Sequence, residues 1–286
     1  MVRVWLDTDV GDDIDDAVAL LCAARRPEIQ LVGVSTVFGW VGIRASLAQE
    51  LLTRAGVQVP VLPGAMAPMA GAPPAQEPAS YNVLAPSKPQ LSPEDDDARL
   101  DAIAAAMRGL GEPFHLVTIG AMTNAARLTE RHPEVRRLWQ GVTCMAGRLE
   151  ADAEWNVWCD PLAAKLVCEQ LSPRLIGLEA CSDTLPRAEV EALVDPADPA
   201  SAYFLECYRA YRGDRPEAPL TLFDPISLLS LVMPEAFDLQ QVRVLVGHEG
   251  RMRLTDDGAP VTYAFSNDWA RLRPVIESVL RGAAIL

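Results

Sequence analysis

The chain has 286 residues, 50% of them hydrophobic, and carries a formal net charge of -14 with a pI near 4.7. This length is sufficient to bury a sizeable core within one large domain. The negative charge disfavours binding to nucleic-acid polymers and to anionic membranes, and it leaves small neutral ligands open as partners.

Cysteine usage predicts a cytoplasmic protein. The six cysteines form no Cys-x-x-Cys pair and have no histidine nearby at zinc-binding spacing. Most lie in apolar surroundings, where free cysteine acts as a small core residue, so reduced thiols are expected. No signal peptide is apparent before the first predicted strand, and no apolar run of about 18 residues predicts a membrane span.

An acidic turn follows the first predicted strand. The apolar run at residues 2–6 leads into six aspartates, and an apolar helix is predicted from residue 15 to 26. Two carboxylates about 4 Å apart repel by roughly 4 kcal/mol at an effective dielectric constant near 20, so this turn predicts a bound cation. Because the turn offers only oxygen ligands, it suits calcium, magnesium or manganese.

Other interpretations of this turn exist. Asp15 and Asp16 at the start of a helix could serve only to cap it, but one or two acids would meet that need. An EF-hand loop fails, because its sixth position, counted from Asp7, is Asp12 instead of glycine. A phosphatase of the haloacid dehalogenase type, with Asp7 as nucleophile, remains open.

Further along the chain, strands alternate with helices. Buried strands are predicted at residues 30–37, 114–119 and 142–147, and helices at 43–55 and 94–110. This alternation is typical of a parallel α/β sheet with right-handed crossovers. Ligands of such sheets bind at the carboxyl ends of the strands, which is where the acidic turn lies.

A proline-rich segment interrupts the alternation. Residues 60–93 contain nine prolines and predict a long irregular loop, which is either a lid or binding loop, or a flexible surface excursion. The remaining predicted elements are a strand at 174–179, broken helix over 186–212, strands at 242–246 and 260–265, and a helix at 268–281. The fold class predicted for residues 1–286 is one open, mostly parallel twisted α/β sheet flanked by helices.

The acidic turn also carries a family resemblance. Asp7-Thr8-Asp9-Val10-Gly11 followed by Asp15-Asp16-Ala17 resembles the amino-terminal signature of the inosine-uridine nucleoside hydrolase family, Asp-x-Asp-Pro-Gly-x-Asp-Asp-Ala. Here Val10 replaces proline, and two extra residues precede the aspartate pair. Assigning the pair to Asp15 and Asp16, instead of Asp12 and Asp13, depends on the helix continuing from Ala17.

Three later segments extend the resemblance. Gly120-Ala121-Met122-Thr123-Asn124 resembles the Gly-Pro-Leu-Thr-Asn turn of the family, although on its own it reads as a helix start. Glu154-Trp155-Asn156 resembles Glu-Phe-Asn, and two such polar residues can point the same way from an extended segment. Phe223-Asp224-Pro225 matches His-Asp-Pro at the aspartate and proline.

The resemblance implies a calcium-dependent enzyme that hydrolyses the N-glycosidic bond of a ribonucleoside, usually as a dimer or tetramer. It implies four calcium ligands, namely Asp9, Asp16, Asp224 and the main-chain carbonyl of Ile119. Asp9 is implied as the general base for a metal-activated water. It also implies three ribose-binding residues, namely Asp15, Glu154 and Asn156.

The pocket departs from the family pattern at two polar positions, and both changes are to aromatic residues. Phe223 replaces the histidine acid, and Trp40 replaces an asparagine beside the ribose. The chain has three histidines, His115, His132 and His248, and each lies in a setting typical of a structural role. We hypothesise that Phe223 and Trp40 stack on an aromatic base, including a cationic one such as nicotinamide in its riboside. A ribose- or nucleoside-binding protein without turnover is the alternative.

Overall fold

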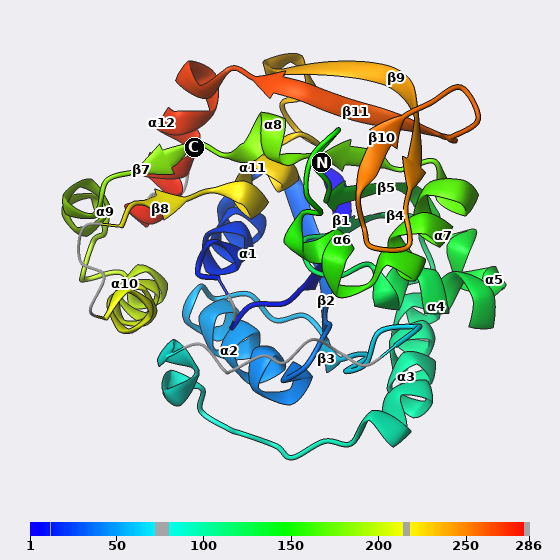
Figure 1. The fold of residues 1–286 in the computed structure, drawn as a ribbon. Coiled ribbons are helices and arrows are strands. Elements are labelled where there is room, and N and C mark those ends of the chain that lie inside the picture. The colour runs from blue at the N-terminus through cyan, green and yellow to red at the C-terminus, as the bar shows by residue number, and fades with distance from the viewer. Residues whose placement is uncertain (12, 72–79, 214–217, 283–286) are drawn as a thin grey trace.

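The computed structural model describes residues 1–11, 13–71, 80–213 and 218–282. A nine-stranded sheet forms the centre of the molecule (Figure 1). Its strands are β1 (Val2–Thr8), β2 (Ile29–Thr36), β3 (Val61–Pro63), β4 (Phe114–Thr118), β5 (Trp139–Met145), β6 (Arg174–Ile176), β9 (Phe237–Val246), β10 (Met252–Leu254) and β11 (Ala259–Asn267). A separate pair consists of β7 (Thr184–Leu185) and β8 (Leu220–Thr221).

The strand order across the sheet is β10-β9-β11-β6-β5-β4-β1-β2-β3. The seven strands from β3 to β11 in this order pair in parallel, and only β9 is antiparallel to its neighbours β10 and β11. The predicted class, a single α/β domain with a mostly parallel sheet, is therefore confirmed. The carboxyl ends of β1, β4 and β5 meet at one edge of this sheet.

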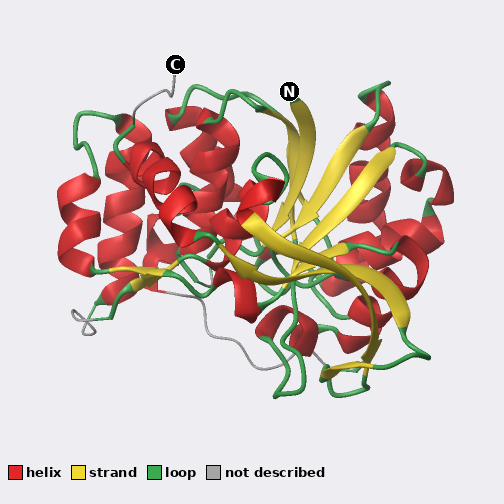
Figure 2. Ribbon diagram, turned by 90° about the horizontal axis from the view of Figure 1, so that it is seen from above, coloured by secondary structure: helices red, strands yellow, loops and turns green. Residues whose placement is uncertain are grey.

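Helices cover both faces of the twisted sheet (Figure 2). The α-helices are α1 (Asp15–Arg25), α2 (Val41–Arg54), α3 (Asp96–Gly109), α4 (Thr123–Arg131), α5 (Pro133–Arg136), α6 (Trp155–Cys159), α7 (Pro161–Leu171), α8 (Leu178–Cys181), α9 (Arg187–Leu193), α10 (Pro199–Arg212), α11 (Phe223–Leu229) and α12 (Trp269–Leu280). Short 3-10 turns lie at Ser80–Leu84, Pro93–Asp95 and Pro234–Ala236.

Successive side chains of β1 point to opposite faces of the sheet and therefore pack into two different layers of the core. Val4 and Leu6 pack into the layer beneath α1 and α11, whereas Trp5 packs on the opposite face, which α3, α4 and α7 cover. Gly33 on β2 makes room for Trp5, because a Cβ there would lie 2.3 Å from the indole ring. The Trp5 Nε1–H donates to Ser35 at 3.0 Å, so this large ring is buried with its polar atom satisfied.

The prediction of an irregular loop over residues 60–93 is wrong at its start. Val61–Pro63 pairs with β2 as the edge strand of the sheet. Backbone N–H groups just after this strand donate to the buried carboxylates of Asp96 and Asp160 at distances from 2.8 to 3.2 Å. These buried acids hold the segment against the domain, while residues 72–79 of the predicted loop lie outside the described residues.

One further expectation needs correction, and one strand of the sheet was missed. The strand predicted over 174–179 ends at Ile176, and Glu179 lies in the short helix α8. The strand β10 was not predicted, because three residues are too few to show a period. All six cysteines are buried and free, as expected. Across the described ranges, no helix has the length and apolarity needed to cross a membrane.

Candidate active site

The acidic turn brings its carboxylates to the carboxyl edge of the sheet. Gly11 allows this sharp turn with a φ of +111°, and a Cβ there would lie 2.8 Å from the Asn82 side chain. Asp15 and Asp16 occupy the first turn of α1. The N-cap residue of this helix is Ile14, and no side chain makes a capping hydrogen bond there. Asp15 instead accepts a hydrogen bond from the Asp224 backbone at 3.0 Å, and Asp16 accepts one from Thr8. The cap-only interpretation therefore fails.

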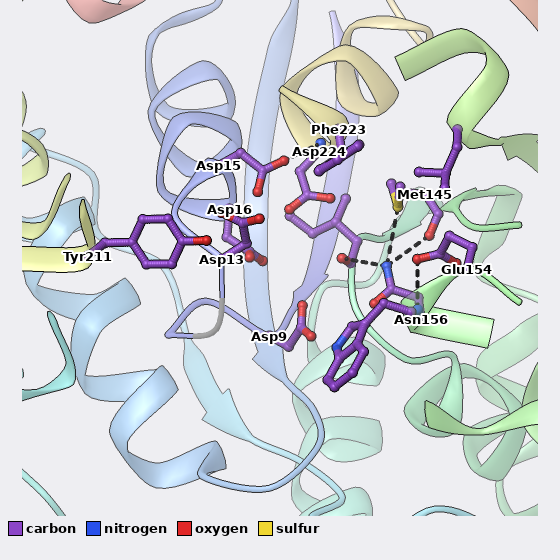
Figure 3. A pocket seen from close by; sticks show the side chains of 13 residues that line it. Asp9, Asp13, Asp15, Asp16, Met145, Glu154, Asn156, Tyr211, Phe223 and Asp224 are labelled. Carbon is purple, nitrogen blue, oxygen red and sulfur yellow. Dashed lines mark hydrogen bonds between the residues drawn. The ribbon is translucent and has the colours of Figure 1, made fainter. Parts of the chain in front are cut away.

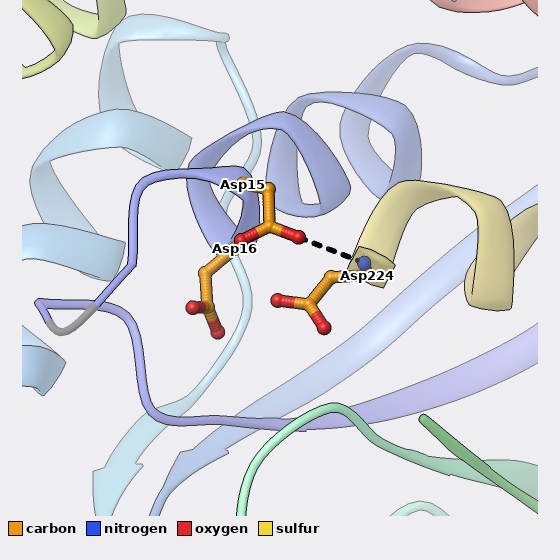
Figure 4. Close-up of side chains that lie close together, drawn as sticks. All are labelled: Asp15, Asp16 and Asp224. Carbon is orange, nitrogen blue, oxygen red and sulfur yellow. Dashed lines mark hydrogen bonds between the residues drawn. The ribbon is translucent and has the colours of Figure 1, made fainter. Parts of the chain in front are cut away.

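Asp15, Asp16 and Asp224 form a compact buried cluster (Figure 4). One oxygen of each carboxylate lies within 4.8 Å of the other two, and no side chain is more than 4% exposed. Burial raises the pKa of each carboxyl well above its usual range, and the neighbouring carboxylates raise it further. At 4.8 Å and an effective dielectric constant near 20, each pair of charges repels by about 3 kcal/mol, which a cation would offset.

A cavity of about 520 Å³ opens beside this cluster (Figure 3). It is lined by Asp9, Asp13, Asp15, Asp16, Ile119, Met145, Glu154, Trp155, Asn156, Leu178, Tyr211, Phe223 and Asp224. The cavity thus gathers every predicted metal ligand and ribose-binding residue, from segments as far apart as β1 and α11. Asp13 also lines the cavity but does not belong to the cluster, and Asp12 is outside the described residues.

Glu154 and Asn156 reach the cavity from a helix start, so the predicted extended segment is correct at Glu154 and wrong at Asn156, which is helical. Glu154 is the N-cap of α6, and its carboxylate accepts backbone hydrogen bonds from Asn156, Val157 and Gly147 at 2.7 to 3.2 Å. The Asn156 amide nitrogen donates to the carbonyl oxygens of Ile119 and Met145, both at 3.1 Å. Both side chains are 5% exposed and held in fixed orientations.

The aromatic residues that line the cavity differ from those expected. Phe223 lines the cavity, but Trp40 does not: it lies at the N-cap of α2 and is 37% exposed. Trp155 and Tyr211 line the cavity instead. Trp155 stands inside the Glu154-Trp155-Asn156 motif, which would have allowed its prediction, whereas Tyr211 lies near the end of α10 without any motif around it.

None of the three histidines lines the cavity. His115 is part of β4, where its ring lies 3.0 Å from the Thr143 hydroxyl and burial lowers its pKa to about 4. His132 pairs with Asp101, and His248 lies in the turn between β9 and β10. These positions agree with structural roles, so no histidine of this chain replaces the one missing at Phe223.

Asp7 is not placed as a nucleophile. Its side chain is 1% exposed and is bonded to Ser35 and to the Asn124 amide, the latter at 2.8 Å. Burial raises its pKa to about 7. Because Asp7 lies beneath the cavity and does not line it, the phosphatase alternative is wrong.

These features define a class: an α/β enzyme with a buried, all-oxygen cluster of the kind that holds a metal ion, set beside a cavity at the carboxyl edge of a parallel sheet. Residues 4–273 match the sequence profile of the inosine-uridine preferring nucleoside hydrolases, and the chain belongs to this family. It is thus a nucleoside hydrolase, an enzyme that acts on N-glycosyl bonds.

Individual relatives agree with this assignment. The non-specific ribonucleoside hydrolase RihC of Escherichia coli (strain SMS-3-5 / SECEC) is 30% identical over 262 residues, covering 86% of this chain and 84% of the relative. A plant nucleoside hydrolase, the PpNRh1 enzyme, has the same fold, with a TM-score of 0.79 at 22% identity over 99% of both chains. The inosine-uridine preferring nucleoside hydrolase of Bacillus anthracis superposes with a TM-score of 0.78 at 18% identity, over 99% of this chain and 100% of that one.

Proposed function

We propose that this chain is a calcium-dependent ribonucleoside hydrolase that releases ribose and a free base. The observation that carries the proposal is the cluster of Asp15, Asp16 and Asp224, whose three buried carboxylates face one cavity together with Asp9 and the Glu154–Asn156 pair. Buried like charges at this separation are costly unless a cation is bound.

The donor set fits calcium. Asp9, Asp16, Asp224 and the Ile119 carbonyl would hold the ion, and all four offer oxygen. Calcium accepts about six to eight oxygen ligands in flexible geometry, whereas zinc sites favour cysteine and histidine. When bound, such a cation acts as a Lewis acid that lowers the pKa of water.

The chain's own residues perform the remaining steps. Asp9, 5% exposed on the cavity wall, accepts the proton of the attacking water as general base. Asp15, Glu154 and Asn156 bind the ribose hydroxyls, and their oxygen atoms stabilise the positive charge that develops on the sugar in an oxocarbenium-like transition state. Because three backbone N–H groups already orient Glu154, little reorganisation is needed.

The decisive assay measures free ribose released from inosine, uridine, cytidine, adenosine and nicotinamide riboside, with added calcium and with a chelator. We expect calcium-dependent release from at least one substrate, and loss of about 1,000-fold in rate with the chelator, as removal of a Lewis acid implies. Tight binding of ribose without release from any substrate would instead support the binding-protein alternative.

A substitution at Gly120 would test whether activity depends on the position of the Asp9 carboxylate. A Cβ at Gly120 would lie 2.8 Å from Asp9 Oδ1 and 2.8 Å from Val37 Cγ1, so Gly120→Ala must displace the carboxylate. We expect kcat/KM to fall by about 10- to 100-fold and stability to fall by about 1 to 3 kcal/mol. Steady-state kinetics and thermal unfolding measure both. Gly109→Ala is the control, since a Cβ there meets nothing within 4 Å; equal kinetics in the two variants would contradict the role of Asp9.

Location and assembly stay predictions. Six buried free cysteines support function in a reducing, cytoplasmic compartment. A homo-oligomer, dimer or tetramer, is predicted from the family resemblance, and sedimentation of the purified protein would measure it. The substrate class is a small ribonucleoside, in agreement with the name of the RihC relative, a non-specific ribonucleoside hydrolase.

A further inference from the structure

The cavity wall has one more carboxylate than the five that the family motifs supply. It carries six carboxylates, those of Asp9, Asp13, Asp15, Asp16, Glu154 and Asp224, and no lysine, arginine or histidine among the described residues that line it. Asp13 belongs to the two residues inserted between Gly11 and the aspartate pair relative to the family signature. The insertion therefore adds negative charge to the wall.

The positive charges near the wall do not balance these acids. The buried guanidinium of Arg44 acts to lower the pKa of Asp16, and its Nε–H donates to the Phe38 carbonyl at 2.8 Å, but Arg44 does not line the cavity. A divalent cation at the cluster would supply two more charges, against six carboxylates. A ligand that brings its own positive charge is favoured in such a field.

Aromatic rings from three elements complete the wall. Trp155 comes from α6, Tyr211 from α10 and Phe223 from α11. Figure 3 places Tyr211 on the side of Asp13, Asp15 and Asp16, and Phe223 beside Asp224. Rings backed by carboxylates attract flat aromatic cations through stacking and cation–π contacts.

The leaving base imposes a second requirement. A neutral purine or uracil departs with a negative charge unless an acid protonates it, and Phe223 stands where the family signature has histidine. In an N-ribosylpyridinium compound, the water oxygen bonds to C1′ as the C1′–N bond breaks, and the bonding electrons return to the ring nitrogen. The base then leaves neutral, the water proton goes to Asp9, and no acid is needed.

We propose that this cavity selects ribonucleosides with a positively charged, pyridinium-type base. This inference rests on the proposed hydrolytic function and narrows its substrate class. The acidic wall attracts the cation, and the three rings contact its faces. Because the base leaves neutral, the reaction does not need the acid that is missing at position 223. The same absence slows hydrolysis of neutral nucleosides.

The test compares three probes in the presence of calcium: nicotinamide riboside, inosine, and 4-nitrophenyl β-riboside, a neutral compound whose leaving group needs no acid. We expect kcat/KM for nicotinamide riboside to exceed that for inosine by about 100-fold or more, the range of a missing general acid. Added salt should lower kcat/KM for the cationic probe and leave the two neutral probes little changed.

Variants separate charge from leaving-group chemistry. Asp13→Asn should lower kcat/KM for nicotinamide riboside about 10-fold more than for 4-nitrophenyl riboside, as expected for a lost charge near a cation. Asp256→Asn, in the turn between β10 and β11, controls for net charge. Phe223→His should raise turnover of inosine without raising that of the cation.

The outcomes distinguish the two proposals. Hydrolysis of inosine equal to or faster than that of nicotinamide riboside, with no response to salt or to Asp13→Asn, would overturn the cationic specificity and leave the hydrolase intact. No calcium-dependent ribose release from any of the three probes would overturn the proposed function itself.

Discussion

Asp224→Asn is expected to lower kcat/KM by about 1,000-fold or more, a loss of roughly 4 kcal/mol of transition-state stabilisation. Asp224 supplies one of three buried carboxylates in the cluster and is the only one that comes from outside the acidic turn. Its replacement removes a ligand charge without changing the size of the side chain. Kinetics at saturating calcium measure the loss, and wild-type activity would contradict the ligand role.

The same variant should be more stable than the wild type when calcium is removed. Each carboxyl of the cluster has a pKa raised above its value in the unfolded chain, so the folded apoprotein binds more protons. The contribution of these three carboxyls to its stability is therefore greatest below about pH 4 and decreases as the pH rises toward the raised values. In Asp224→Asn this decrease should be smaller, because one repelling charge is gone.

Thermal unfolding with chelator and with calcium provides the measurement. Calcium should raise the Tm of the wild type more than that of Asp224→Asn, since binding to the folded state alone stabilises it. Asp238→Asn, on the exposed part of β9, is the matched control for loss of one negative charge. Identical calcium responses in wild type and Asp224→Asn would place the ion elsewhere.

Asp9→Ala should reduce kcat by about 100- to 10,000-fold, the range for loss of a general base. Asp9 lines the cavity but does not belong to the three-carboxylate cluster among the described acids, so its role as a base can be tested apart from the ligand role that it is proposed to share with Asp224. Part of the calcium-dependent rise in Tm should remain in this variant, because Asp16 and Asp224 are still present.

Because Asp9 is both a proposed calcium ligand and the proposed base, azide is used to separate the loss of the base from the loss of a ligand. As an anionic nucleophile it needs no deprotonation, so it should restore breakage of the N-glycosidic bond in Asp9→Ala and form a ribosyl azide. Asp224→Asn should not be rescued. If azide restored both variants equally or neither of them, Asp9 would not be the general base.

Much of the site could be predicted because its parts are local. A strand, a turn rich in aspartate and an apolar helix follow one another within 25 residues, and the repulsion among those acids already indicates a cation. Their position at the carboxyl edge follows from the alternation of strands and helices. Asp224 was predictable only through its motif, since an Asp-Pro pair before a helix otherwise reads as a cap.

Other features depended on packing between distant segments. Residues 154–156 were predicted as extended, and Glu154 is, but Asn156 already lies in α6. The Glu154 carboxylate caps this helix and also accepts a hydrogen bond from Gly147, which lies outside the helix. The edge strand β3 forms because β2 offers it a partner, although prolines dominate the surrounding sequence. Trp40 was predicted at the cavity but does not line it, and Tyr211, for which no prediction was made, does, since no local pattern shows which helix end faces the cavity.

By itself the sequence determined the parallel α/β architecture and the acidic turn after the first strand, and it indicated an all-oxygen set of candidate metal ligands. These follow from periodicity and charge over short stretches of chain. Only the tertiary structure decided that Asp224, 209 residues beyond Asp15, donates its backbone N–H to that carboxylate. It also decided which rings face the cavity. The positions of these rings depend on how whole helices pack across the sheet, and that packing involves side chains throughout the core.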